Sequence, residues 1–118
     1  MKHELKIKRV YESPDQNDGR RILVDRLWPR GLTKEKAKIN LWLEDIAPST
    51  ELRKWFGHDP KKWRGFRERY HIELKDHADQ LELVKKHAKE GPVTLVYGAR
   101  DQEHNEAVVL KQFLEEDR

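Results

Sequence analysis

The sequence predicts a small α/β layer fold for a chain of 118 residues, a length that suits one domain spanning residues 1–118. Two short apolar runs, at residues 21–27 and 93–97, are typical of buried strands. Between them, apolar residues recur at spacings of three and four over residues 60–90, which indicates a long amphipathic helix. Strands that bracket helices in this way favour helices packed against a sheet.

The other elements are predicted from shorter patterns. Residues 5–11 alternate as a strand does, and the connection to the next strand is too short for a crossover helix, so these two strands could pair antiparallel. Thr33 is a fitting N-cap for one helical turn, and Ser49 for a short helix over residues 50–56. Residues 39–43 alternate as a third strand would, with a short amphipathic helix as the alternative.

The long helix has a clear start and end. Asp59 is a fitting N-cap, Pro60 a fitting first residue, and Gly91 closes the pattern. The helix could bend or break at residues 76–79. A final helix is expected over residues 103–116.

Composition narrows the function classes. The chain has no cysteine, which excludes disulfides, thiolate zinc sites and cysteine nucleophiles. No apolar run approaches the roughly 20 residues that cross a bilayer, and the N-terminus has no signal-peptide core, so we expect a cytoplasmic protein without a membrane partner. Residues 1–40 carry 11 lysines and arginines against 6 aspartates and glutamates, an excess that favours an anionic ligand.

The densest group of candidate site residues stands where the second predicted strand ends. Asp25, Arg26, Trp28 and Arg30 occur within six positions. An arginine here could grip a phosphate or carboxylate through two hydrogen bonds, Trp28 could stack on a flat ring, and Asp25 could orient a ligand or act as a base. In the structural alternative, Asp25 pairs with a nearby arginine and Trp28 belongs to the core.

Two further groups lie at predicted helix ends. His58 stands in a turn between helices, and histidine suits acid–base chemistry, although a hydrogen-bonded turn histidine is the alternative. Arg53 could join an anion site or lie on the helix surface. Asp101 and Asn105 precede the final helix, whose free N–H groups favour an anion; plain capping is the alternative.

Other classes of site receive less support. The sequence lacks paired-histidine metal motifs, a phosphate-binding P-loop and the dinucleotide-binding glycine pattern, so neither a metal nor a cofactor is expected. Basic residues crowd the start of the long helix with aromatic residues between them, a pattern that could follow a nucleic-acid backbone or form the solvated edge of the helix. They are Lys61, Lys62, Arg64, Arg67 and Arg69.

Four motifs give the chain a resemblance to a known family. They are VDRLWPRG at residues 24–31, APSTELRKWFGHDP at 47–60, W-x-x-F-x-x-x-Y-x-x-E-L at 63–74 and VTLVYGARDQEHNEA at 93–107. Through them the chain resembles, over nearly its whole length, the YeaO-like family of small bacterial proteins, classed under domain of unknown function 488. The family is uncharacterised.

The resemblance implies a small three-layer α/β/α domain with a mainly parallel sheet, which disfavours the antiparallel pairing considered above. Relatives in the wider superfamily carry a cysteine at a strand end and a Cys-His-Arg helix start, near Tyr97 and Asn105 here. Because this chain has no cysteine, that thiol chemistry does not carry over. The family motifs mark Asp25, Arg26, Trp28, Arg30, Arg53, His58, Asp101 and Asn105 as candidate site residues.

Together these observations predict a polar cleft at the strand ends that binds a small phosphate- or carboxylate-bearing ligand. The ligand-binding residues would be Arg26, Trp28, Arg30, Arg53, Asp101 and Asn105. Asp25 and His58 would form the acid–base pair of a metal-free hydrolase or transferase. The sequence leaves open whether the protein is an enzyme, and it also leaves a nucleic-acid-binding module and a non-catalytic interaction protein as alternatives.

Overall fold

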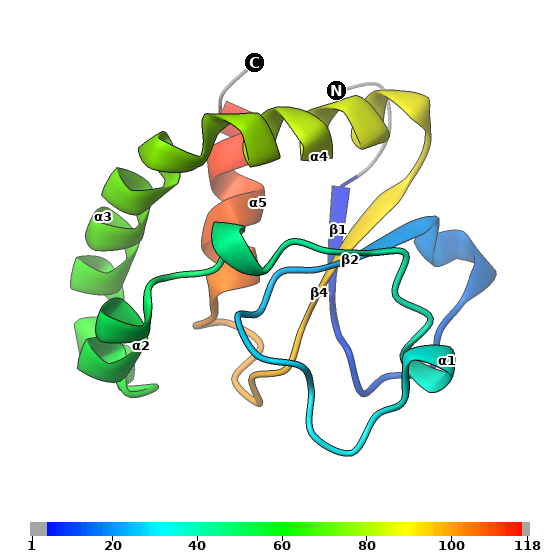
Figure 1. Ribbon diagram of the computed structural model, residues 1–118. Helices are drawn as coiled ribbons and strands as arrows, with labels where there is room; N and C mark the ends of the chain where they lie inside the picture. Colours follow the sequence, from blue (N-terminus) through cyan, green and yellow to red (C-terminus); the bar gives the residue numbers. More distant parts are fainter. Residues whose placement is uncertain (1–4, 117–118) are drawn as a thin grey trace.

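The computed structural model describes residues 5–116 and contains a four-stranded sheet in which all neighbouring strands pair in parallel (Figure 1). The strands are β1 (Leu5–Arg9), β2 (Arg20–Leu23), β3 (Leu41–Trp42) and β4 (Val93–Tyr97), and their order across the sheet is β1-β4-β2-β3. The antiparallel pairing of β1 with β2 is therefore wrong, because β4 lies between them. β4 is buried at every residue, as a central strand of a parallel sheet must be.

Five α-helices accompany the strands in the described part of the chain. They are α1 (Lys34–Ala37), α2 (Thr50–Phe56), α3 (Trp63–Leu74), α4 (Ala78–Glu90) and α5 (Glu106–Glu116). The long helix expected over residues 60–90 is divided into α3 and α4 by a 3-10 turn at Lys75–His77, and Figure 1 shows the sharp change of direction there. None of the described helices is long and apolar enough to cross a membrane.

Two predicted N-caps are confirmed, and the start of the last helix differs from the prediction. Thr33 and Ser49 each accept a backbone N–H of the helix that follows, as predicted for N-caps. α5 begins at Glu106 rather than at residue 103, because the Asn105 side chain accepts the N–H of the third helical residue and sets the start. The terminal stretches, residues 1–4 and 117–118, lie outside the described residues, so the expected absence of a signal-peptide core is not addressed at residues 1–4.

The sheet separates two apolar clusters and so gives the three layers that the resemblance implies. Ile22 and Leu95 face the larger cluster, which includes side chains from α2, α3, α4 and α5. Leu23 and Val96, one residue further along each strand, face the smaller cluster with Ala37 of α1. The second helical layer therefore consists of the short α1 and the loop around it.

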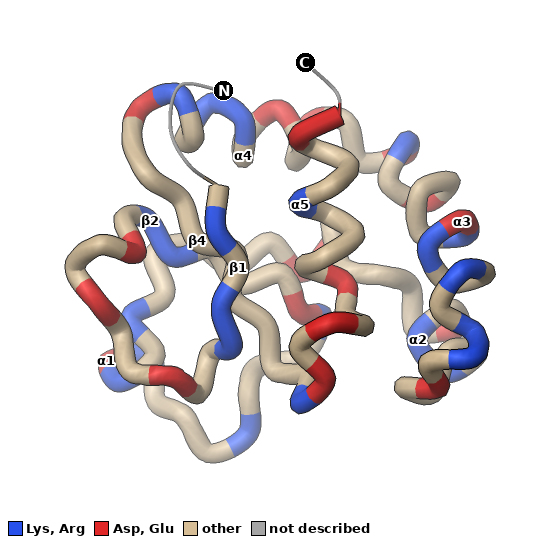
Figure 2. The backbone as a smooth tube through the Cα atoms, turned by 180° about the vertical axis from the view of Figure 1, so that it is seen from behind, with Lys and Arg blue, Asp and Glu red and all other residues tan. Residues whose placement is uncertain are grey.

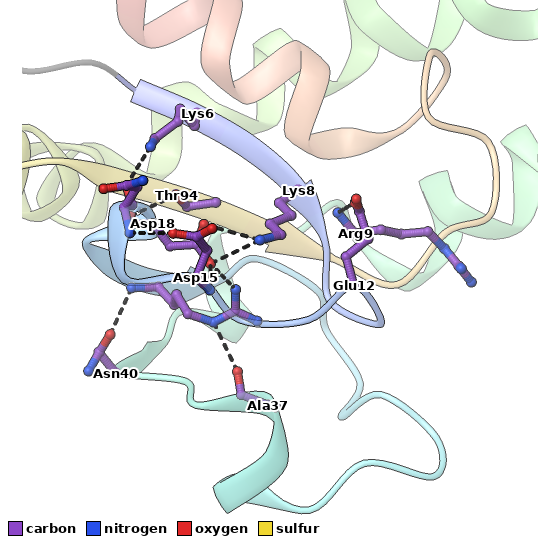
Figure 3. Close-up of polar contacts among 11 residues, drawn as sticks. Lys6, Lys8, Arg9, Glu12, Asp15, Asp18, Ala37, Asn40 and Thr94 are labelled. Carbon is purple, nitrogen blue, oxygen red and sulfur yellow. Dashed lines mark hydrogen bonds and ion pairs between the residues drawn. The ribbon is translucent and has the colours of Figure 1, made fainter.

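A buried ion-pair network fixes the connection between β1 and β2 to the sheet (Figure 3). The Asp18 carboxylate accepts hydrogen bonds from Arg21 Nη1 at 2.6 Å and from Lys8 Nζ at 3.2 Å, and its backbone carbonyl accepts one from the Thr94 hydroxyl at 2.7 Å. Arg21 Nε donates to the carbonyl of Ala37 at 2.9 Å. Part of the basic excess in residues 1–40 is therefore used inside the fold.

Candidate functional site

A pocket of about 250 Å³ lies at the carboxyl ends of β2 and β4. Its walls are residues 25–27 after β2, residues 98–99 after β4, the start of α5, residues in and around α2, and Phe66 of α3. Parallel strands end at the same edge of a sheet, so loops far apart in the chain meet there. The hydrogen bond from the Gly98 N–H to Asp25 Oδ2, 2.8 Å long, joins residues 73 positions apart.

The pocket brings together five of the eight candidate residues. They are Asp25, Arg26, Arg53, His58 and Asn105. These residues come from three separate segments of the chain, and the sequence motifs alone gave no distance between them. The expected cleft at the strand ends therefore has a geometric counterpart.

Two of the other three candidates point elsewhere. The Trp28 ring packs edge-on against the Trp42 ring with centroids 5.5 Å apart, and its Nε1 donates to the Leu32 carbonyl at 2.7 Å. Arg30 is exposed, and only its backbone carbonyl makes a described contact, with the Tyr11 hydroxyl at 2.8 Å. Neither side chain lines the pocket.

The two arginines that line the pocket differ in how many of their donors are already hydrogen-bonded within the protein. Arg26 Nε donates to the Pro48 carbonyl at 3.1 Å and its Nη2 donates to the Ala47 carbonyl at 3.1 Å, so Arg26 ties the loop after β2 to the segment before α2. Arg53, on α2, is exposed, and within residues 5–116 no carboxylate lies within 4.0 Å of it. Arg53 is the cation most available to a ligand.

Glu106, which sequence reasoning missed, lies beside Asp25 in the pocket. It is the first residue of α5, and its carboxyl is hydrogen-bonded to that of Asp25. Burial, followed by the charge of Asp25 and this hydrogen bond, raises the pKa of Glu106 well above 4.5, while Arg53 and a backbone N–H act in the opposite direction. Glu106 therefore keeps its proton over a pH range in which an ordinary glutamate is ionised.

Gly98 allows the Asp25 carboxylate to approach the backbone closely. A Cβ atom at Gly98 would stand 2.9 Å from Asp25 Oδ2, closer than such atoms are found. Because Gly98 has no side chain, the Asp25 carboxylate, which follows β2, can lie against the end of β4. Sequence reasoning noted the turn at Gly98 but had no signal for this contact.

Asp101 acts on the pocket through His104. Asp101 Oδ2 lies 2.9 Å from His104 Nδ1, and the His104 ring, which lines the pocket, packs edge-on against the Trp63 ring. Hydrogen bonds from the Glu103 N–H and then from the His104 ring lower the pKa of Asp101. Asp101 thus stays ionised and holds His104 in position, while Asn105 caps α5 and also lines the pocket.

His58 reaches the pocket from the turn between α2 and α3. It is exposed and has a positive φ of 58°, directly after Gly57. Among the described residues no hydrogen bond joins His58 to Asp25, so proton exchange between them requires a ligand or a water molecule as a bridge. No group of three His, Asp or Glu residues suited to a metal ion occurs in the described chain.

An aromatic wall closes one side of the pocket. Phe56 of α2 and Phe66 of α3 are both buried, and their rings stack with centroids 4.4 Å apart. Both also line the pocket. A ligand in the pocket would therefore meet charged groups on some sides and an apolar surface on another.

Comparisons with known proteins place the chain in a family. Residues 4–118 match the family described as "Inactive DUF488-N3 subclade". The uncharacterized protein YeaO of Escherichia coli K12 is 44% identical over 110 residues, which cover 93% of this chain and 96% of YeaO. Uncharacterized proteins of Mycobacterium bovis and Mycobacterium tuberculosis are each 42% identical over 110 residues, 93% of this chain and 92% of theirs. No solved structure matches. The chain therefore belongs to the YeaO-like DUF488 family, within the subclade described as inactive.

Proposed function

We propose that this protein binds a small anionic ligand in the pocket at the carboxyl ends of β2 and β4. The observation that carries this proposal is the convergence of Arg26, Arg53 and His58 on one pocket from separate segments. Arg26 and Arg53 both line this pocket, so an anionic group bound there would meet two positively charged guanidinium groups. Arginine presents a planar set of donors that matches a carboxylate or phosphate, which favours such a group near Arg53.

The size of the pocket limits the ligand. Pockets for drug-sized molecules begin at about 300 Å³, and this pocket encloses about 250 Å³. A monosaccharide phosphate, a small carboxylic acid or an amino acid fits that volume better than a dinucleotide. Part of the wall is apolar, formed by Phe56 and Phe66, so the ligand need not be polar on every side.

Binding without catalysis is the form of the proposal that the family description supports, because the subclade is described as inactive. A metal-free hydrolase or transferase is the second candidate, since Asp25 and His58 line the same pocket. That candidate predicts turnover of a phosphate or carboxylate ester that is lost in His58→Gln. Pure binding predicts no turnover by the wild-type protein.

The nucleic-acid alternative depends on the basic residues of the 3-10 turn Pro60–Lys62 and of α3. Figure 2 shows Lys and Arg along α3, with Asp and Glu spread over the rest of the molecule. Several of these cations already have partners: the Arg69 guanidinium stacks 3.9 Å from the Trp55 ring centroid, and Arg64 pairs with Glu68 at 3.5 Å. Affinity for an oligonucleotide that falls steeply with salt would support this alternative.

Thermal-shift measurements with small anions test the proposal. The probes are inorganic phosphate, sugar phosphates, nucleotides and small carboxylic acids. A ligand that binds only the folded protein at 100 times its Kd adds about 2.7 kcal/mol of stability, which corresponds to a shift of several degrees in Tm. We expect a shift with at least one class of probe.

The matched variants are Arg53→Gln and Arg30→Gln, which remove exposed arginines inside and outside the pocket respectively. We expect the shift to be lost in Arg53→Gln and retained in Arg30→Gln. The absence of a shift with every anion would refute the proposal. Equal loss in both variants would indicate general charge attraction rather than a site.

A further inference from the structure

We infer that the ligand of this pocket carries an ammonium group close to its anionic group, so that it is an amino acid or a similar small zwitterion. This inference rests on the proposed function and specifies the ligand class. The ammonium group would lie against Asp25 and Glu106, and the anionic group would face Arg53. The inference comes from a cavity whose walls carry both signs of charge.

The first argument is a missing cation. Asp25 and Glu106 are two acids in direct contact, and within residues 5–116 no Lys, Arg or His nitrogen lies within 4.0 Å of either carboxylate. Both residues are half-buried, and carboxyl groups withdrawn from water are usually paired or bound to a cation. Arg26, the neighbouring cation in the chain, donates instead to the carbonyls of Ala47 and Pro48.

The second argument is that the acids face the cavity. Both line the pocket, and the one backbone donor described for the Asp25 carboxylate is the Gly98 N–H on Oδ2, while the Trp42 indole donates to the Asp25 backbone carbonyl. The remaining oxygen atoms of the pair can accept further hydrogen bonds from a ligand. An ammonium group brings three donors and a positive charge, which suits two carboxylates better than a hydroxyl with one donor does.

The third argument is the arrangement of the opposite charge. Arg53 is close enough to Glu106 to act on it electrostatically, and both residues line the same cavity. A cationic and an anionic group joined by a short linker can therefore contact both. Phe56 and Phe66 provide an apolar surface in the same cavity for the rest of the molecule.

Ammonium binding has a measurable consequence, because a positive charge beside Glu106 would lower its raised pKa and favour release of its proton. In the complex, two carboxylates and two arginines then surround a neutral zwitterion. Several other titratable or charged groups face the pair from the neighbouring elements, and the test has to separate them from Glu106. They are Arg26, Arg53, His58, His104, Tyr70 of α3 and Tyr97 of β4.

The experiment compares matched ligands. Amino acids and the 2-hydroxy acids with the same side chains, such as phenylalanine with phenyllactate and aspartate with malate, are first screened by thermal shift. Binding is then measured by calorimetry in phosphate and in Tris buffer, whose ionisation enthalpies differ. We expect at least one amino acid to bind about tenfold or more tightly than its hydroxy analogue, with release of a proton.

The variant Glu106→Gln and its control Glu103→Gln assign the proton. Glu103 is exposed and lies outside the pocket, three residues before Glu106. Proton release and the preference for the amino acid should disappear in Glu106→Gln and persist in Glu103→Gln. Release that persists in Glu106→Gln would come from another group, such as His58 or His104, and would overturn the inference.

The remaining outcomes separate this inference from the proposed function. If a hydroxy acid, or only a phosphate-bearing probe, binds in an Arg53-dependent manner without proton release, the ammonium inference is overturned and the proposed function stands. If no probe of any class binds, both are overturned. Binding of an amino acid that is unaffected by Arg53→Gln would also overturn the inference.

Discussion

Replacement of Asp18 by asparagine should remove a large part of the stability of this fold. Asp18 is 5% exposed, and its carboxylate accepts hydrogen bonds from Arg21 at 2.6 Å, from Lys8 at 3.2 Å and from the Asp15 N–H at 3.0 Å (Figure 3). Arg21 is 3% exposed, and its Nη2 makes no hydrogen bond in the described chain. Removing one partner of a buried ion pair costs about 3–5 kcal/mol, compared with a total stability of about 5–15 kcal/mol for a typical domain.

Urea unfolding, followed by tryptophan fluorescence and far-UV circular dichroism, measures this loss as a lower midpoint at an unchanged slope. The double variant Asp18→Asn with Arg21→Met is the control, because it removes the stranded cation as well and should recover part of the loss. A loss below about 1 kcal/mol in Asp18→Asn, as is common for exposed ion pairs, would refute the reasoning.

The pH dependence gives a second test of the same prediction. Burial tends to raise the pKa of Asp18, but the hydrogen bonds from the Asp15 backbone, Arg21 and Lys8 outweigh it and hold the pKa below 3.8. A carboxyl with a lowered pKa binds fewer protons in the folded state than in the unfolded state. Its contribution is therefore present above about pH 4 and is lost as the pH falls through the lowered value. The stability difference between wild type and Asp18→Asn should close in acid.

Three further substitutions test other parts of the structure. Glu106→Gln should raise Tm at neutral pH and leave it unchanged near pH 4. The reason is that the raised pKa of Glu106 makes the folded protein lose stability as the pH rises above 4.5. Thermal melts across pH measure this, and a change in Tm confined to acid would contradict it. Gly98→Ala should displace the Asp25 carboxylate and cost about 1.5–3 kcal/mol in urea unfolding, whereas Gly91→Ala, with open space around it, should be nearly neutral. Gly19→Ala should lower the free energy of unfolding by at least about 1–3 kcal/mol, because Gly19 has a φ of 65° and an added Cβ would meet the Pro92 carbonyl. A loss of stability no greater than that of Gly91→Ala would disprove the clash.

The two strands beside the pocket could be predicted from the sequence because their signals are local, although the strand predicted over residues 21–27 ends at Leu23. The apolar run before Asp25 and the buried run at residues 93–97 each predict a strand, and a polar residue after each strand predicts a site at the sheet edge. The order of the strands could not be predicted in this way. It depends on β4 joining β1 and β2 on its two sides, pairings that link residues more than 70 positions apart.

Glu106 escaped prediction for a related reason. An acidic residue in the first turn of a helix is common, because it complements the helix dipole, so the sequence gives no reason to single it out. What sets Glu106 apart is Asp25, which is distant in the chain and reaches it because Gly98 leaves room. Trp28 and Arg30 show the opposite case, since they stand near Asp25 in sequence but lie outside the pocket.

Asp18 and Glu106 lie on opposite sides of the sheet, and their partners indicate different roles. Asp18 has two cations and a backbone N–H as partners, and its pKa is lowered, as expected for a group that stabilises the fold. Glu106 has an acid as its neighbour, and its pKa is raised, so the folded protein holds a group that favours unfolding at high pH. Strongly perturbed acids in a cavity are typical of functional sites. The contrast favours the pocket, rather than the basic N-terminal third of the chain, as the site of the proposed ligand.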